Sequence, residues 1–416
     1  MPSLPALRKP IPHAVGWLAL ALGFSLPIST ALDNVLFAAI MALWLAAGDW
    51  RAKLARLRAS PPALAILLLL ALTAAGMMWG GGSGSERWRY FGKYANLLLA
   101  LCLLTLPLAR PLRLRAFAGF GLAILVTVTW SYGIYSGLVP DQWIPADQVR
   151  ENPVVFKAQI THGFFVAVGC FVFVVGALHA RHQRWRWLLY IGAAVAAGNV
   201  LITHGRTGYL VLAVLAAYLF IERFRWRGAL LSGVAIATMA LTAQQFPESA
   251  VMARVTKGIG EVQRWEYGRE DSTSMGERLQ FAATSLRIIA DHPVIGVGTG
   301  GFEDAYRDKI ADTQARVSNN PHNQYLLTTV QLGVHGLLAL LAVFGILWHT
   351  SRNLPPPERT LARGLLLAYM VGNLFNSFHY DHAEALFFAW SMGLLFCGTR
   401  STDTAGPPDA RLSPRS

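Results

Sequence analysis

Asp291-His-Pro-Val-Ile-Gly-Val-Gly-Thr-Gly-Gly-Phe302 is a glycine-rich stretch inside the one long polar segment of this chain, residues 245–326. The same segment holds Ser274-Met-Gly-Glu-Arg278 before this stretch and Asn319-Asn-Pro-His322-Asn-Gln-Tyr-Leu326 after it. Apolar runs precede and follow the segment. We therefore interpret it as a folded polar insertion around which an otherwise apolar chain is organised.

The composition indicates a membrane protein. Of the 416 residues, 54% are hydrophobic and only 14% are charged, and the mean hydropathy is +0.40, whereas an ordinary soluble domain is about a quarter charged. The net charge of +13 does not indicate nucleic-acid binding, because the basic residues form short clusters between apolar runs. Cys102, Cys170 and Cys397 all lie in apolar runs without metal-ligand or redox spacing.

The apolar runs predict an all-α polytopic membrane protein with about twelve transmembrane helices. Each run is near the ~20 residues that cross a hydrocarbon core. They predict a single transmembrane domain over residues 1–399, with the polar segment 245–326 as its large loop, and a disordered cytoplasmic tail at 400–416. The predicted spans are 14–30, 34–49, 62–80, 94–109, 116–139, 160–180, 187–204, 207–222, 228–244, 334–350, 362–380 and 383–399.

The positions of the basic clusters predict the orientation of the chain. With twelve spans, all the arginine-rich connections fall on one side, together with both termini, and the positive-inside rule makes that side the cytoplasm. By the same parity the loop 245–326, the turn at His204-Gly-Arg206 and the corner at Asp381 lie outside.

The outer loop contains short helices by its pattern. Apolar residues recur at helical spacing from Ser274 to Asp291, and Pro293 with the glycines that follow ends the repeat. A second helical piece is expected over 302–313.

Two arginines are candidate anion ligands. Arg206 lies where one apolar run ends and the next begins, and an arginine at that depth is costly unless it pairs or lines a water-filled cavity; the alternative is a side chain that extends to the membrane interface. Arg278 lies on the outer helix, where the alternative is a solvated charge paired with Glu277 or Asp271. Two guanidiniums from different segments would suit a pyrophosphate, since each donates bidentate hydrogen bonds and stays charged.

His322 is the candidate base. It follows a proline at the start of a membrane segment, among amide side chains that include Asn323, and a histidine can take a proton from a sugar hydroxyl near neutral pH. The alternative is a histidine held by neighbouring amides at a helix start. Asp381 either orients His322 or an arginine, or caps a helix, and Lys93 either adds charge to a phosphate site or extends to the interface. The carboxylates show no spacing typical of a metal site.

These motifs together resemble a known family. Ser274-x-x-x-Arg278, His292-Pro-x-x-Gly-x-Gly-x-Gly-x-Phe302, His322-Asn-x-x-Leu326 and Gly333-x-x-Gly336 are similar to the O-antigen ligase and polymerase superfamily of bacterial envelope assembly. The turn Gly205-Arg206-Thr-Gly208 is similar to the arginine that precedes the large periplasmic loop of that superfamily. Outside 203–336 the resemblance is one of hydrophobicity alone.

The resemblance implies an integral inner-membrane glycosyltransferase of the GT-C type, with its active site facing the periplasm. The donor would be a polysaccharide on undecaprenyl pyrophosphate, and the acceptor a sugar hydroxyl of the lipid A–core oligosaccharide. Transfer would invert the anomeric carbon, with neither a metal nor another cofactor. Arg206 and Arg278 would hold the donor pyrophosphate, and His322 would be the general base, with Asn323, Asp381 and Lys93 in supporting positions.

Other functions fit the same features. An O-antigen polymerase or a protein O-oligosaccharyltransferase would use the same donor. A lipid-linked sugar transporter or flippase also has many spans and intramembrane arginines, but transporters tend to show two related halves. The single late and asymmetric polar insertion favours an enzyme.

Overall fold

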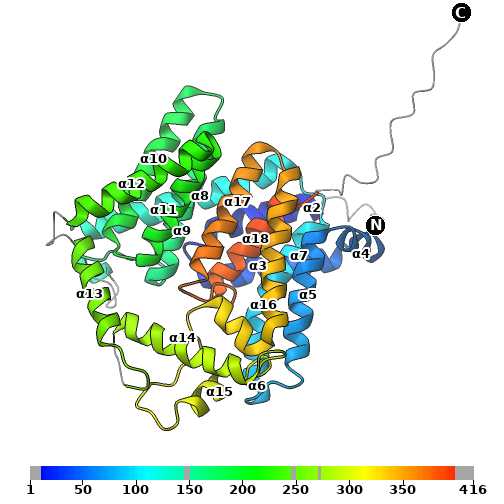
Figure 1. Ribbon diagram of the computed structural model, residues 1–416. Coiled ribbons are helices and arrows are strands. Elements are labelled where there is room, and N and C mark those ends of the chain that lie inside the picture. Colours follow the sequence, from blue (N-terminus) through cyan, green and yellow to red (C-terminus); the bar gives the residue numbers. More distant parts are fainter. Residues whose placement is uncertain (1–10, 145–149, 245–249, 270–272, 399–416) are drawn as a thin grey trace, which may run out of the picture.

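The computed structural model describes residues 11–144, 150–244, 250–269 and 273–398. Within these ranges every regular element is a helix (Figure 1). The first ten residues and the predicted tail at 400–416 lie outside the described residues, as do parts of the predicted loop at 245–249 and 270–272.

The α-helices are α2 (Ile11–Ser25), α3 (Thr30–Ala46), α4 (Trp50–Arg58), α5 (Pro61–Gly76), α6 (Gly84–Tyr94), α7 (Leu98–Thr105), α8 (Arg110–Tyr135), α9 (Gln159–His179), α10 (Gln183–Ile202), α11 (Arg206–Phe224), α12 (Trp226–Gln244), α13 (Ala250–Arg264), α14 (Ser274–Asp291), α15 (Phe302–Lys309), α16 (Gln324–Thr350), α17 (Pro356–Gly372) and α18 (His382–Phe396). Three short 3-10 helices, η1 (Ala95–Leu97), η2 (Asp141–Trp143) and η3 (Ser351–Asn353), complete the set.

Polar caps fix where several helices begin. The side chains of Ser29, Ser60, Thr273 and Asn323 each accept a hydrogen bond from a backbone N–H in the first turn of the helix that follows. Such bonds satisfy donors that the helix itself leaves unpaired. Ser83 and Glu86 form a reciprocal capping box at the start of α6.

Among the described residues, five helices are long and apolar enough to cross a membrane: α8, α9, α10, α11, and α16 with η3. A sixth is added if α3 and α4, which meet at a 111° bend, form one span; α2, α5 and α18 are shorter apolar helices. Each of the twelve predicted spans overlaps a helix. The chain is therefore an all-helical polytopic membrane protein, while the count of twelve stays a prediction.

Two predicted spans have different bounds in the structure. Instead of 94–109, the helical path runs without a loop from Gly84 to Thr105 through α6, η1 and α7. Instead of 362–380, α17 ends at Gly372, and the residues from Asn373 to Asp381 form a polar turn. The turn forms because Asn373 Oδ1 accepts from the Phe378 N–H at 3.2 Å, a local bond that hydropathy does not detect.

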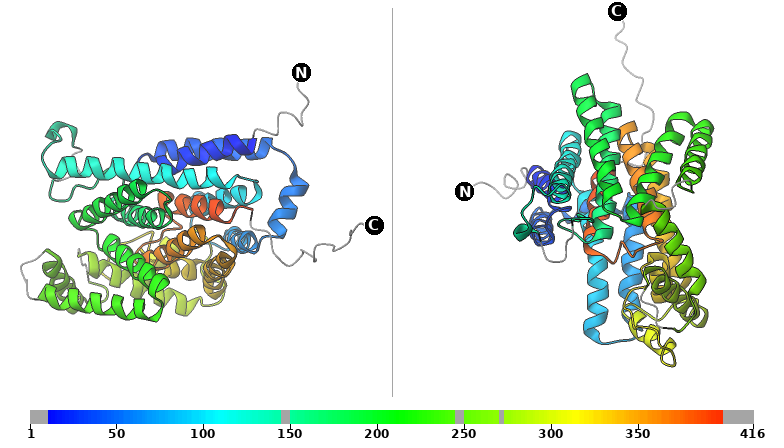
Figure 2. Two further views of the ribbon diagram at one scale, coloured as in Figure 1. Left: turned by 90° about the horizontal axis from the view of Figure 1, so that it is seen from above. Right: turned by 90° about the vertical axis from the view of Figure 1, so that its left-hand side faces the viewer.

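The core of the bundle is aromatic. Phe120 of α8, Phe165 of α9 and Phe387 of α18 pack against one another, and Trp390 stacks on Phe387. From above, α2 lies alongside α8 (Figure 2). Trp390 Nε1 of α18 donates to the Ala19 carbonyl of α2 at 2.7 Å. This bond fixes α18 against α2.

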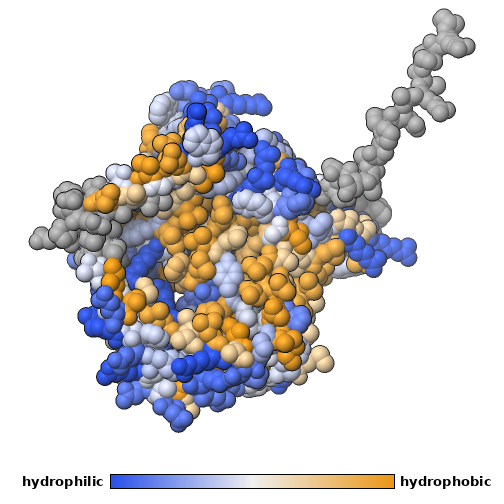
Figure 3. Space-filling model, viewed as in Figure 1, coloured by the Kyte–Doolittle hydropathy of each residue, from blue (hydrophilic) through white to orange (hydrophobic). Residues whose placement is uncertain are grey.

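The outer segment consists of α13, α14 and α15 at one end of the molecule (Figure 1). The helix predicted over 274–291 is confirmed as α14, and α15 occupies the first part of the piece expected over 302–313. The helix α13 was not predicted. Figure 3 shows hydrophobic residues across the middle of the molecule, hydrophilic residues over the outer segment, and a hollow between this segment and the bundle.

Candidate functional site

Arg206 is the first residue of α11, and two glycines bring this end of α11 close to α9. A Cβ atom on Gly208 would lie 3.1 Å from the Cα of Gly163 in α9. The turn before Arg206 is fixed because Gln159 Nε2 donates to the Thr203 carbonyl at 3.2 Å. Arg206 is half-buried, and its Nη1 atom is buried without a hydrogen-bond partner in the part of the chain that the structure describes. An orphaned donor of this kind indicates a missing anion or water.

Arg278 lies in the second turn of α14, which packs against α15 and α16. Burial and the positive charge of Arg206 lower the pKa of the Arg278 guanidinium, while Glu277 raises it. The two arginines, 72 positions apart in the chain (278 − 206), therefore come within electrostatic reach of each other. Among the described residues no ion pair joins either guanidinium to a carboxylate; the predicted alternative partner Asp271 lies outside them.

His322 lies beside the helix that carries Arg278. The ring of Phe281, one turn after Arg278 on α14, is 5.8 Å from the His322 ring between centroids, and residues three apart share a helix face. His322 has φ = +50°, uncommon outside glycine, and its N–H donates to Asn320 Oδ1 at 3.0 Å. Its Nδ1 is 3.1 Å from Asn376 Oδ1. The His322 ring thus lies against α14, the helix that carries Arg278, and a site shared by His322 and the two arginines stays a prediction.

Asp381 connects to His322 through Asn376. Its Oδ2 accepts from Asn376 Nδ2 at 2.7 Å. Although Asp381 is the N-cap residue of α18, its side chain makes no capping bond within the described residues, so the capping role is wrong. Burial raises the pKa of Asp381, and the charges of His322 and Lys93 oppose that shift.

Lys93 and Asn323 lie at the edge of this cluster. Lys93 belongs to α6, and its Nζ is 5.3 Å from the centroid of the Tyr380 ring. Asn323 caps α16 through Oδ1 and donates from Nδ2 to the Leu374 carbonyl at 3.0 Å. Its amide therefore joins α16 to the polar turn, and a direct role in binding stays a prediction.

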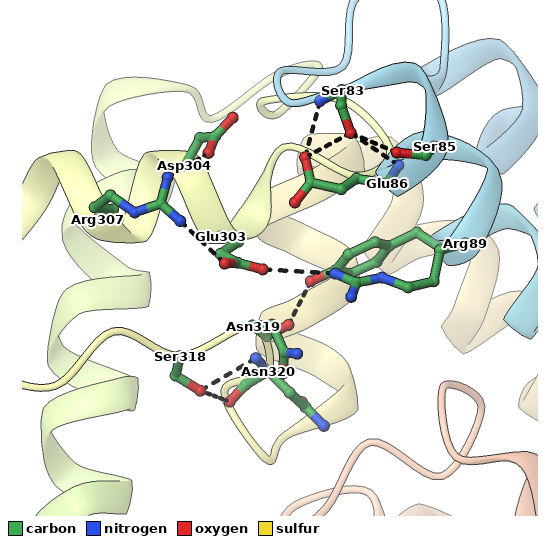
Figure 4. Close-up of polar contacts among 11 residues, drawn as sticks. Ser83, Ser85, Glu86, Arg89, Glu303, Asp304, Arg307, Ser318, Asn319 and Asn320 are labelled. Carbon is green, nitrogen blue, oxygen red and sulfur yellow. Dashed lines mark hydrogen bonds and ion pairs between the residues drawn. The ribbon is translucent and has the colours of Figure 1, made fainter.

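A polar network ties the loop before His322 to α6 (Figure 4). Glu303 of α15 pairs with Arg89 of α6 at 3.5 Å and with Arg307 at 3.0 Å. The Tyr90 hydroxyl donates to the Asn319 carbonyl, three residues before His322. These bonds hold the residues before His322 against α6.

The backbone of the glycine stretch at 296–301 bonds to two helices, α5 and α16. The N–H groups of Val297 and Gly298 donate to the carbonyls of Val330 and Gln331 in α16, both at 2.8 Å. The N–H of Thr299 donates to the Gly76 carbonyl of α5 at 2.9 Å. The stretch therefore joins α5 to α16 below the outer segment.

Two amide side chains hold His322: Asn320, which the sequence already placed among its neighbouring amides, and Asn376, which sequence reasoning missed. Asn320 lies in the predicted loop, and Asn376 lies in a predicted membrane span. The sequence feature that could have identified Asn376 is the group of polar residues Asn373, Asn376 and Ser377 at the end of an apolar run. Across the described residues there is no group of three or more His, Cys, Asp and Glu side chains placed to hold a metal ion.

The fold and these residues define a polytopic helical membrane protein with a cationic site and a histidine under an outer helical segment. Residues 191–341 match the family model described as O-antigen ligase. The matched region contains Arg206, Arg278 and His322.

A curated relative adds no function. The chain is 23% identical over 161 residues to an uncharacterized protein of Haemophilus influenzae strain Rd. The alignment covers 37% of this chain and 40% of that relative, so the chain matches well under half of the relative's length.

Proposed function

We propose that the protein is an O-antigen ligase, which transfers a polysaccharide from undecaprenyl pyrophosphate to a sugar hydroxyl of the lipid A–core oligosaccharide. The observation that carries the proposal is the pair Arg206 and Arg278, whose positive charges interact. Neither arginine forms an ion pair with a carboxylate among the described residues, Arg206 Nη1 is buried without a partner there, and His322 lies against the helix of Arg278. The family match to O-antigen ligase supports the class of donor and acceptor.

The arginine pair suits a pyrophosphate. Two guanidiniums brought together repel each other, and a dianionic ligand between them converts that repulsion into attraction. A guanidinium donates paired hydrogen bonds that match two phosphate oxygens. The same contacts strengthen as the glycosidic bond breaks, because negative charge grows on the departing pyrophosphate.

His322 is the proposed general base of a single displacement. As the acceptor oxygen attacks the anomeric carbon, its proton moves to His322 Nε2 and the new C–O bond forms. The bond to the pyrophosphate oxygen breaks, and the electron pair leaves with the pyrophosphate. Attack opposite the leaving group inverts the anomeric carbon. The leaving group needs no added proton, since pyrophosphate is stable as an anion.

The topology proposal completes the assignment. The arginine-rich connections favour a topology in which they and both termini lie on the cytoplasmic side of the bacterial inner membrane. The outer segment and the site would then face the periplasm, where lipid-linked donor and lipid A–core enter laterally from the bilayer. The GT-C type of fold belongs to the same proposal.

Transfer between purified components tests the function. Wild-type protein in detergent or nanodiscs is mixed with an undecaprenyl-pyrophosphate-linked polysaccharide and lipid A–core, and the product is followed by gel mobility. We expect transfer by wild type and by the control His349→Ala, whose histidine is exposed at the far end of α16, and none by His322→Ala.

Other products would replace the proposal. Growth of the polymer on the donor itself would indicate a polymerase, and attachment to a protein would indicate a protein O-oligosaccharyltransferase. Movement of the intact donor across a vesicle membrane, without transfer, would indicate a transporter.

A further inference from the structure

A chain of two hydrogen bonds runs from His322 into the polar turn between α17 and α18. His322 Nδ1 is 3.1 Å from Asn376 Oδ1, and Asn376 Nδ2 is 2.7 Å from Asp381 Oδ2. Asn376 is buried, with 5% of its surface exposed. It lies beyond the residues that match the family model.

The direction of these bonds follows from the chemistry of the two side chains. A carboxylate only accepts hydrogen bonds, so the group that Asn376 presents to Asp381 is its NH₂. The amide oxygen then faces His322 and can only accept. His322 Nδ1 must therefore carry the hydrogen, and in a neutral imidazole Nε2 then holds the lone pair.

Neighbouring contacts hold both members in place. Asn320 Oδ1 accepts from the His322 N–H at 3.0 Å and from Ser377 Oγ at 2.7 Å, so the residue next to Asn376 is tied to the residue before Pro321. Phe281 covers the imidazole from α14. The ring is thus restrained by its backbone, by one face and by Nδ1.

We propose that Asn376 is a positioning residue that holds His322 in its Nδ1–H tautomer and leaves Nε2 free to accept a proton. The proposal rests on the proposed function for its catalytic meaning, and Asp381 acts through Asn376 by fixing the orientation of the amide. Without Asn376, imidazole would divide between two tautomers, and the one with hydrogen on Nε2 cannot act as a base there.

The tautomer is measured directly by ¹⁵N NMR of histidine-labelled protein in nanodiscs, above the pH at which the ring protonates. The His322 signals are assigned by their loss in His322→Gln. We expect a protonated Nδ1 and an unprotonated Nε2 in wild type. In Asn376→Leu, which keeps the size of the side chain but neither hydrogen bond, we expect a mixture of both tautomers. Wild-type His322 with hydrogen on Nε2 would overturn the proposal.

Kinetics provide the second measurement. We expect Asn376→Leu to lower kcat by about 10²-fold, within the usual range for a displaced general base, and to change the donor KM by less than about threefold. A wild-type kcat in Asn376→Leu would overturn the proposal. The NMR result needs no turnover. A protein that shows the expected tautomer but no transfer would therefore refute the proposed function and leave the role of Asn376 in holding the tautomer intact.

A double substitution separates positioning from packing. Asn376→Asp/Asp381→Asn exchanges the two side chains, so the carboxylate introduced at position 376 still accepts from Nδ1–H and the introduced amide still donates to it. We expect this exchange to keep the wild-type tautomer and to restore at least a third of kcat. If Asn376→Leu fails to fold, this variant decides the question: an exchanged pair with the Nε2–H tautomer would refute the proposal.

Discussion

Gly333 interrupts α16 with a backbone conformation that only glycine adopts readily. Its φ is +62° and its ψ is −158° inside an otherwise continuous helix. A Cβ atom there would lie 2.1 Å from the carbonyl oxygen of Val294 and 2.3 Å from its carbonyl carbon. Both atoms belong to the backbone, so no side-chain rotation relieves the contact. Gly333→Ala therefore forces α16 away from the turn after α14.

The cost has two parts. Holding alanine in this region of φ and ψ costs of order 1–3 kcal/mol. Moving the turn away breaks the bond from the Val334 N–H to the Pro293 carbonyl, which is 2.9 Å long, and a lost hydrogen bond costs about 1 kcal/mol. We expect Gly333→Ala to destabilise the protein by about 2–4 kcal/mol as the sum of these terms.

Three buried free cysteines make the measurement simple. Cys102, Cys170 and Cys397 become reactive only as the protein unfolds, so a thiol-reactive fluorescent dye reports the apparent unfolding temperature in detergent. The matched control is Gly345→Ala on the same helix, where a Cβ meets nothing within 4 Å. We expect the control to change stability by no more than about 1 kcal/mol, with the sign favouring alanine. Equal unfolding temperatures for the two variants would refute the steric argument.

Four further predictions concern the site. Arg278→Lys should lower transfer at least about tenfold, because an ammonium cannot make the paired bonds of a guanidinium; unchanged kinetics would count against a bidentate clamp. Arg206→Gln should raise the apparent unfolding temperature of the ligand-free protein while abolishing transfer, since it removes the repulsion with Arg278. EDTA should leave wild-type transfer unchanged, and a loss restored by a divalent cation would contradict this. Burial raises the folded-state pKa of Asp381, so the folded chain holds that proton more tightly than the unfolded chain. Stability therefore falls as the pH rises from the ordinary carboxyl pKa of about 3.9 through the raised value. Asp381→Asn should unfold at a higher temperature than wild type at pH 8, by a margin that shrinks as the pH falls through the raised pKa towards the ordinary one.

The sequence predicted the helix that carries Arg278 residue for residue. An apolar repeat at helical spacing and a proline after the last turn are local signals, and α14 runs from Ser274 to Asp291 as they indicate. A shared anion site for Arg206 and Arg278 was a hypothesis from the chemistry of two guanidiniums and from the family resemblance, and it stays a prediction.

The setting of His322 could not be predicted in the same way. Its partner Asn376 is 54 positions away, inside a stretch that hydropathy assigns to a membrane span. Hydropathy averaged over a window does not detect three polar side chains among aromatic ones. Only the folded turn after Gly372 shows that these side chains, of Asn373, Asn376 and Ser377, are buried. The span at 94–109 was displaced for a related reason, because the charged residues of α6 begin the helix outside the apolar run.

The unpaired arginines also bear on turnover. On the proposed reaction, the pyrophosphate carries more negative charge after transfer than before, yet Arg206 and Arg278 remain equally cationic. The spent lipid carrier is then held more tightly than the substrate that replaces it. Release of undecaprenyl pyrophosphate, rather than bond breaking, becomes the slow event, and the rate at which the cell removes this product from the outer leaflet would set the pace of the enzyme.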